Sequence, residues 1–149
     1  HIDRPGTDVV SWAQQACDAD LCFTGIVDGM EKWQLYRVAE LFLLPTRSEN
    51  FGMTVAEAAC MGKPVITTHG APWRGLEEHA AGWWVPVSVG GLRDALRLAT
   101  AMPSAELSDM GRRGKRWVEQ TFGWESLADR WIDVYRWTLG LAEKPKDVL

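Results

Sequence analysis

Residues 41–68 read LFLLPTRSENFGMTVAEAACMGKPVITT and determine the fold that we expect. The runs LFLLP and PVITT are apolar on both faces, which is typical of parallel strands that are covered on both sides. Between them a helix is predicted over 53–61, and it stops at Gly62, just before Pro64. The order strand, helix, strand predicts an α/β fold around a parallel sheet.

The same alternation continues on either side of this stretch. Four strands are predicted at 21–24, 41–44, 64–68 and 83–87, and four helices at 8–17, 30–40, 53–61 and 72–80. After residue 87 only helices follow, at about 89–101, 104–120 and 124–141. In the last of these, Leu127, Trp131 and Tyr135 lie on one stripe, so Trp131 and Trp137 are expected to be packing anchors.

Composition excludes several classes of protein. The chain of 149 residues is long enough for one domain, and its net charge of −4 provides no basic field for nucleic acid. Its three cysteines have no metal-ligand spacing and are most simply explained by a reducing compartment, so a cytoplasmic location is expected. No apolar run approaches the length needed to span a bilayer.

The loop after the strand at 41–44 is the first candidate site, because ligands of open parallel sheets bind outside the carboxyl ends of the strands. Gly52 allows a ligand to approach the backbone closely. The N–H groups of Met53 and Thr54 would face an anion at the positive end of the following helix. This arrangement predicts a phosphate site.

Two glutamates accompany this loop. Glu57 lies one turn inside the helix, among small apolar residues, and its two oxygens could accept hydrogen bonds from the two hydroxyls of a ribose. The alternative is that Glu57 only gains the roughly 0.3 to 1 kcal/mol of a carboxylate near a helix N-terminus. Glu49 lies in the loop, where it either reaches a group beyond the phosphate or is a solvated acid. The residues alone leave these alternatives open.

An ordered series of motifs resembles a known family. The course FTGIVDGMEKWQLYRVAELFLLPTRSE, two glutamates separated by seven residues in SENFGMTVAEAACMGKPVITT, and later GWWVPV and FGWESLADRW occur in that order. From about Cys22 to Trp137 the chain resembles the C-terminal, donor-binding half of retaining glycosyltransferases of family 4. That resemblance implies the GT-B fold, with a Rossmann-like parallel sheet flanked by helices.

The resemblance also implies an activity and the residues responsible for it. The expected reaction is transfer of a sugar from a nucleotide diphosphate sugar to an acceptor hydroxyl, with retention of configuration, no divalent metal and no cofactor. Glu49 would bind the hydroxyls of the donor sugar at the catalytic centre, and Glu57 those of the ribose. The other expected donor-binding residues are Phe51, Gly52, Met53 and Thr54 at the sugar and diphosphate, Gly25, Ile26 and Val27 near the base, and Gly70 as a flexible position beside the sugar.

The resemblance further suggests that the chain is a fragment. Residues 1–142 would form a partial nucleotide-sugar-binding domain that lacks its first strand-helix-strand unit, and 143–149 a frayed tail. The acceptor-binding N-terminal domain would be absent, and any membrane contact would be made through it. Trp73 would either line the sugar pocket or cover the core. The rival functions are a non-catalytic nucleotide-binding module of the same fold and a nucleotide-sugar epimerase.

Overall fold

The computed structural model describes residues 22–146. The chain divides into two compact units, His1–Gln34 and Leu35–Leu149, which are described separately. The helix expected at 8–17 lies outside the described residues. In the first unit, residues 22–24 are exposed and form no strand, in contrast to the strand predicted at 21–24. A strand needs a neighbour to satisfy its backbone groups, and these residues pair with no strand of the described chain.

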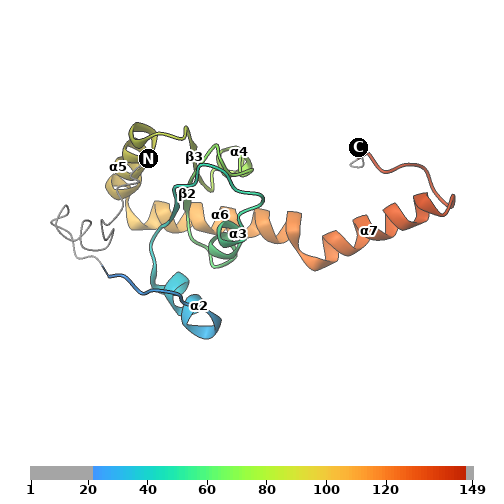
Figure 1. The fold of residues 1–149 in the computed structure, drawn as a ribbon, viewed down its shortest axis with the longest axis horizontal. Helices are drawn as coiled ribbons and strands as arrows, with labels where there is room; N and C mark the ends of the chain where they lie inside the picture. The colour runs from blue at the N-terminus through green and yellow to red at the C-terminus, as the bar shows by residue number, and fades with distance from the viewer. Residues whose placement is uncertain (1–21, 147–149) are drawn as a thin grey trace, which may run out of the picture. The chain divides into compact units, whose positions relative to one another are not determined.

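The second unit is built on a three-stranded parallel sheet (Figure 1). Its strands are β1 (Phe42–Leu44), β2 (Val65–Thr68) and β3 (Gly82–Val85), in the order β1-β2-β3. All four residues of the central strand β2 are buried. The predicted α/β fold with a parallel sheet is therefore confirmed. Strand β3 ends earlier than expected because Pro86 has no N–H to continue the ladder.

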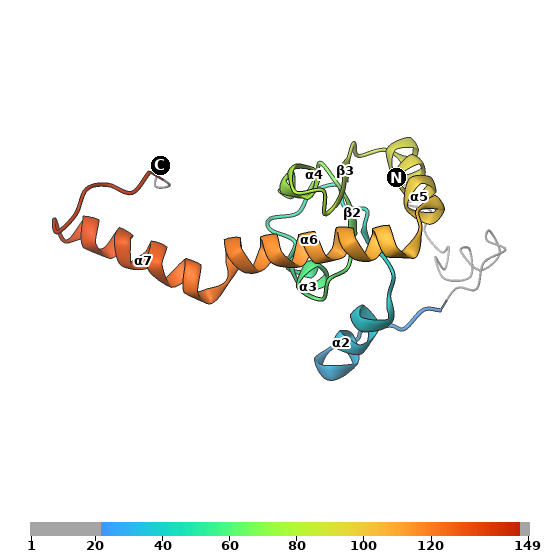
Figure 2. The same ribbon diagram turned by 180° about the vertical axis from the view of Figure 1, so that it is seen from behind.

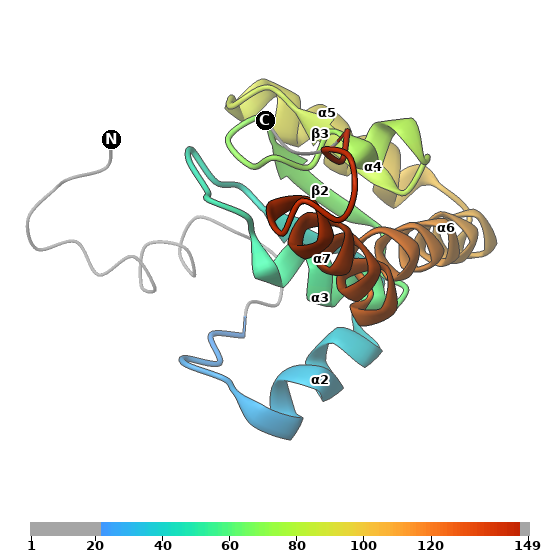
Figure 3. The same cartoon turned by 90° about the vertical axis from the view of Figure 1, so that its right-hand side faces the viewer.

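Helices cover both faces of this sheet, as Figure 3 shows. On one face, α3 (Met53–Cys60) and α6 (Ser104–Phe122) pack with β2 in a core that includes Val55, Val65 and Val118. On the other face, α5 (Val89–Ala101) packs on Ile66. Val65 and Ile66 point to opposite faces because side chains alternate along a strand. The apolar run PVITT thus contributes side chains to the hydrophobic cores on both faces of the sheet.

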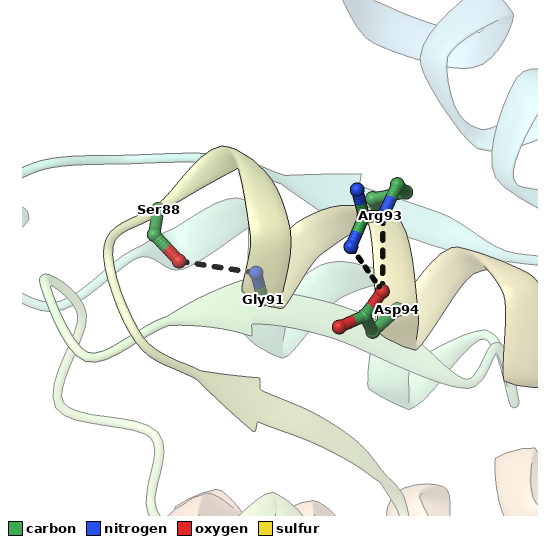
Figure 4. A network of polar contacts seen from close by, with 4 residues as sticks. All are labelled: Ser88, Gly91, Arg93 and Asp94. Atoms are coloured by element: carbon green, nitrogen blue, oxygen red, sulfur yellow. Dashed lines mark hydrogen bonds and ion pairs between the residues drawn. The ribbon is translucent and has the colours of Figure 1, made fainter.

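The start of α5 is fixed by a side-chain cap (Figure 4). The hydroxyl of Ser88 accepts a hydrogen bond from the N–H of Gly91 at 3.0 Å. One turn later, Arg93 and Asp94 form an exposed ion pair at 3.0 Å. Serine is a favoured N-cap residue, so the helix starts at Val89 despite the two glycines that follow.

The helix expected at 72–80 is reduced to the single turn α4 (Gly75–Glu78). Residues 71–74 instead form a tight turn, in which the N–H of Trp73 donates to the carbonyl of Ala71 at 2.8 Å. Helix α2 (Gly29–Val38) and helix α3 lie close to their expected positions.

The last helix, α7 (Trp124–Thr138), follows α6 at Gly123 (Figure 2). None of its residues is buried, and Trp131 is 58% exposed. The expectation that Trp131 is a packing anchor is therefore wrong, because within the described chain α7 packs mainly on α6 and its apolar stripe is left uncovered. Among residues 22–146 no helix is long and apolar enough to cross a membrane.

Candidate functional site

Two loops meet at the carboxyl edge of the sheet, one after β1 and one after β2. The hydroxyl of Thr67 donates to the carbonyl of Leu44 at 3.0 Å, and the hydroxyl of Thr68 donates to the carbonyl of Thr46. Further along, the N–H of Glu49 donates to the carbonyl of Gly70 at 2.8 Å. Strand ends and loops are thus joined by successive hydrogen bonds, which fix the backbone that carries Glu49.

Gly70 is required by the close approach of these two loops. A Cβ atom at Gly70 would lie 2.5 Å from the carbonyl carbon and oxygen of Arg47 and 2.8 Å from the carbonyl oxygen of Thr46. Its φ is not positive, so its backbone conformation does not by itself require glycine, and its role beside the sugar stays a prediction. Gly70 provides space for the backbone of the loop that bears Glu49.

A stability comparison tests this role of Gly70. We expect Gly70→Ala to lower the free energy of unfolding by about 1 to 3 kcal/mol, since the added methyl group meets backbone atoms that cannot rotate away. The matched control is Gly90→Ala in α5, where nothing lies within 4 Å of the added atom. That variant should be neutral or more stable by up to about 1 kcal/mol. Urea unfolding measures both, and equal stabilities would contradict the close approach.

Trp73 supports the same loop from the core side. Its side chain is 1% exposed, and its indole N–H donates to the carbonyl of Phe51. The two rings pack with centroids 5.2 Å apart, and Trp73 also contacts Trp117 and Phe122. Of the two alternatives for Trp73, the structure supports the one in which it covers the core.

This hydrogen bond sets the direction of the next amide. Because a trans peptide is planar, its N–H points opposite to its C=O. The carbonyl of Phe51 points at the buried indole, so the N–H of Gly52 points away from the core. Gly52 is also the N-cap of α3, with φ +81°. A side chain there would be strained and crowded, since a Cβ atom would lie 3.1 Å from the indole nitrogen of Trp73.

The N-terminus of α3 is open beyond this glycine. Met53 is 63% exposed, and Thr54 is exposed as well. The first N–H groups of a helix have no acceptor inside the helix, and the helix dipole adds partial positive charge there. Together with the N–H of Gly52, these groups offer hydrogen-bond donors that suit an anion, and the phosphate site itself stays a prediction.

Glu49 is exposed beside this helix end. Its Oε1 atom accepts a hydrogen bond from the N–H of Asn50 at 3.1 Å. The Cγ atom of Glu49 lies 3.3 Å from the position that a Cβ of Gly52 would occupy, so the acid stands next to the outward-facing backbone. A carboxylate at this place can accept hydrogen bonds from hydroxyl groups.

Glu57 is half-buried in α3 and has a partner within the protein. The hydroxyl of Tyr36, in α2, donates to Oε2 of Glu57 at 3.1 Å and lies 3.5 Å from the carbonyl oxygen of Thr54. Tyr36 is 8% exposed, and its ring meets Phe42 edge-on with centroids 5.6 Å apart. Burial first, and then the hydrogen bond to Glu57 and the charge of that carboxylate, raise the pKa of Tyr36 to about 12.

Tyr36 was not predicted from the sequence, which suggested a ribose or the helix dipole, and no protein side chain, as the partner of Glu57. A signal was present, since Tyr36 lies in a helix that directly precedes the apolar run of β1. A tyrosine buried at such a place usually finds a partner for its hydroxyl. Sequence spacing could not identify that partner, because Tyr36 and Glu57 are 21 residues apart.

Three further residues were predicted to lie near the base. Gly25, Ile26 and Val27 belong to the unit His1–Gln34, where Gly25 has φ +68° and Ile26 is fully exposed. Their role near a base stays a prediction. His69 is exposed at the end of β2, and its Nε2 atom lies 3.1 Å from the carbonyl oxygen of Trp84.

Surface hollows also lie elsewhere, along the exposed side of α6. One of about 430 Å³ is lined by the basic run of this helix and its acidic neighbours. There Arg112 pairs with Asp109, and Lys115 lies 3.8 Å from Glu119. This face has the character of a solvated helix surface, and the candidate site at the sheet edge is separate from it.

The chain matches a known protein family and several curated proteins. A family model described as "Glycosyl transferases group 1" matches residues 12–117. One curated relative is a D-inositol 3-phosphate glycosyltransferase of Gordonia bronchialis, 34% identical over 106 residues, which cover 68% of this chain and 22% of the relative. Another is an alpha-galactosylglucosyldiacylglycerol synthase of Streptococcus pneumoniae, 29% identical over 84% of this chain and 32% of the relative.

A solved structure agrees with these matches. Sucrose-phosphate synthase from Thermosynechococcus elongatus superposes with a TM-score of 0.63 at 25% identity, over 72% of this chain and 27% of that protein. The chain thus spans only between 22% and 32% of the length of these three proteins.

Proposed function

The chain belongs to the group 1 glycosyltransferases and has the GT-B fold, and on this basis we propose that it is the donor-binding part of a retaining, metal-independent enzyme of family 4. The donor is a nucleotide diphosphate sugar, and the product carries the sugar on an acceptor hydroxyl. The aligned parts cover only 22% and 32% of the two curated relatives, which supports an acceptor-binding domain in the same protein. We propose that it works in the cytoplasm.

One observation carries this proposal. Glu49 stands beside Gly52, whose N–H faces outward at the carboxyl edge of a parallel sheet, and Glu57 lies one turn inside α3, the helix that begins after Gly52. A diol at Glu57, an anion at the helix end and further hydroxyls at Glu49 match the ribose, the diphosphate and the sugar, which follow one another in this order in the donor. The N–H groups of Phe51, Gly52 and Met53, with Thr54, would bind the diphosphate and the adjoining sugar.

The reaction breaks the bond between the anomeric carbon and the phosphate oxygen and forms a bond to the acceptor oxygen on the same face. The acceptor proton passes to an oxygen of the leaving diphosphate. The protein then needs to orient the donor and stabilise the charge that develops on the phosphate, without supplying a nucleophile. The helix end and the outward N–H of Gly52 supply that stabilisation.

The test is a transfer assay with the complete gene product. We expect release of nucleoside diphosphate from one of UDP-, GDP- or ADP-sugars in the presence of acceptor, unchanged by EDTA, with retained anomeric configuration by proton NMR. An inverted sugar carbon without transfer would support an epimerase. Nucleotide binding without any turnover would support a non-catalytic module.

A further inference from the structure

The hydroxyl of Tyr36 contacts the acid that is central to the proposed function. Its hydroxyl donates to Oε2 of Glu57 at 3.1 Å, and its distance of 3.5 Å to the carbonyl oxygen of Thr54 makes the carboxylate the better acceptor. The rest of the side chain packs against Phe42 and is 8% exposed. The hydroxyl is therefore held in place by a fixed ring.

This contact restricts the rotation of the Glu57 side chain. Glutamate has three rotatable bonds, and their freedom must be lost when its oxygens bind a ligand. A tyrosine ring has only two, and that of Tyr36 is already fixed by packing. A carboxylate offers about four lone-pair sites, so one hydrogen bond from Tyr36 is compatible with two more from neighbouring hydroxyls.

We propose that Tyr36 is a positioning residue for donor binding, which holds the Glu57 carboxylate in the orientation that accepts the two ribose hydroxyls of the nucleotide. The inference rests on the proposed function, since it assigns a role toward the same ligand. Tyr36 does not touch the donor and acts through Glu57. The hydroxyl remains a donor over the whole physiological range, because its pKa is raised to about 12.

The test is Tyr36→Phe in the complete gene product, with nucleotide affinity measured by calorimetry. Phenylalanine keeps the ring and its contact with Phe42 and removes only the hydroxyl. The ligand is whichever of UDP, GDP and ADP binds the unchanged protein most tightly. We expect its affinity to fall about tenfold, because a tenfold change corresponds to the free energy of about one hydrogen bond to a charged group. Tyr135→Phe is the matched control, since Tyr135 is the other tyrosine of the chain and is 61% exposed in α7.

A second ligand distinguishes a role of Tyr36 in positioning Glu57 from a role in supporting the fold. The 2′-deoxy form of the same nucleotide lacks one of the two hydroxyls. The unchanged protein should prefer the ribose form, and Tyr36→Phe should reduce this preference. A loss of affinity equal for both forms, or no loss at all, would overturn the positioning role.

A double-mutant cycle distinguishes failure of this inference from failure of the proposed function. If Tyr36 acts through Glu57, Tyr36→Phe should have no further effect in a Glu57→Ala background. Additive losses would overturn the inference and leave the ribose role of Glu57 standing. Unchanged affinity in Glu57→Ala alone would instead refute the proposed function.

The hydrogen bond between Tyr36 and Glu57 can also be tested without ligand. This experiment keeps Tyr36, so it does not depend on the folding of Tyr36→Phe. With tyrosine labelled at its ¹³Cζ atom, the resonance of Tyr36 should titrate with a pKa of about 12, above the ordinary value of 10.0. A pKa raised on folding stabilises the native state below about pH 10, and this contribution is lost as pH rises through about 12. Glu57→Gln should lower the pKa of Tyr36, and an unchanged pKa would contradict the contact.

Discussion

Nucleoside diphosphate is expected to bind at least about a hundredfold more weakly to the Glu57→Ala variant than to the unchanged protein. Two charge-assisted hydrogen bonds to a ribose contribute roughly 3 to 6 kcal/mol together, and about 1.4 kcal/mol corresponds to tenfold in affinity. Alanine is the best helix former and is already present on either side, at Ala56 and Ala58. Helix α3 should therefore persist, although the buried Tyr36 hydroxyl loses its carboxylate acceptor, which should lower the free energy of unfolding by about 1 to 3 kcal/mol.

The control for this prediction addresses the alternative that Glu57 only interacts with the helix dipole. Glu106 is an exposed acid in the first turn of α6. Glu106→Ala removes a carboxylate from such a position without touching the site, so it should lower stability by at most about 1 kcal/mol and leave affinity unchanged. Titration calorimetry of both variants decides between the two interpretations. If Glu57→Ala behaved like Glu106→Ala, the ribose role would be lost.

For Glu49→Ala we expect the second large effect, a loss of at least about a hundredfold in the rate of sugar transfer, with only a modest loss of nucleoside diphosphate binding. Glu49 is proposed to contact the sugar, which free nucleotide lacks, and interactions with the reacting group strengthen toward the transition state. The backbone bond from Glu49 to Gly70 does not involve the side chain and should survive. Steady-state kinetics and calorimetry provide the two measurements.

Two further variants sharpen the interpretation of Glu49. Glu49→Gln keeps the size and one acceptor oxygen but removes the charge, so it should retain more activity than Glu49→Ala. Glu77→Ala, an exposed acid in α4, should leave both quantities unchanged. Equal losses of transfer and of nucleotide binding in Glu49→Ala would mean that the acid contacts the nucleotide or the loop and not the sugar.

The sequence by itself determined the fold class of this protein and the position of the candidate loop. The apolar runs LFLLP and PVITT, with a helix ended by Gly62 and Pro64 between them, were enough to predict β1, α3 and β2 and their parallel arrangement. Parallel strands bring their carboxyl ends to one edge, so the position of the Glu49 loop followed from the same pattern. The ordered motifs predicted a glycosyltransferase, and the matched model of the group 1 glycosyltransferases confirms this coarser prediction.

Only the tertiary structure decided which side chains support the site. It placed Trp73 in the core beneath Phe51, brought Gly70 against the backbone of Arg47, and joined Tyr36 to Glu57. It also left the apolar stripe of α7 exposed, where periodicity had indicated a packed face. The physical reason is that periodicity and turn residues report the local backbone. These contacts instead join residues far apart in the chain, and they depend on which faces meet when the elements pack.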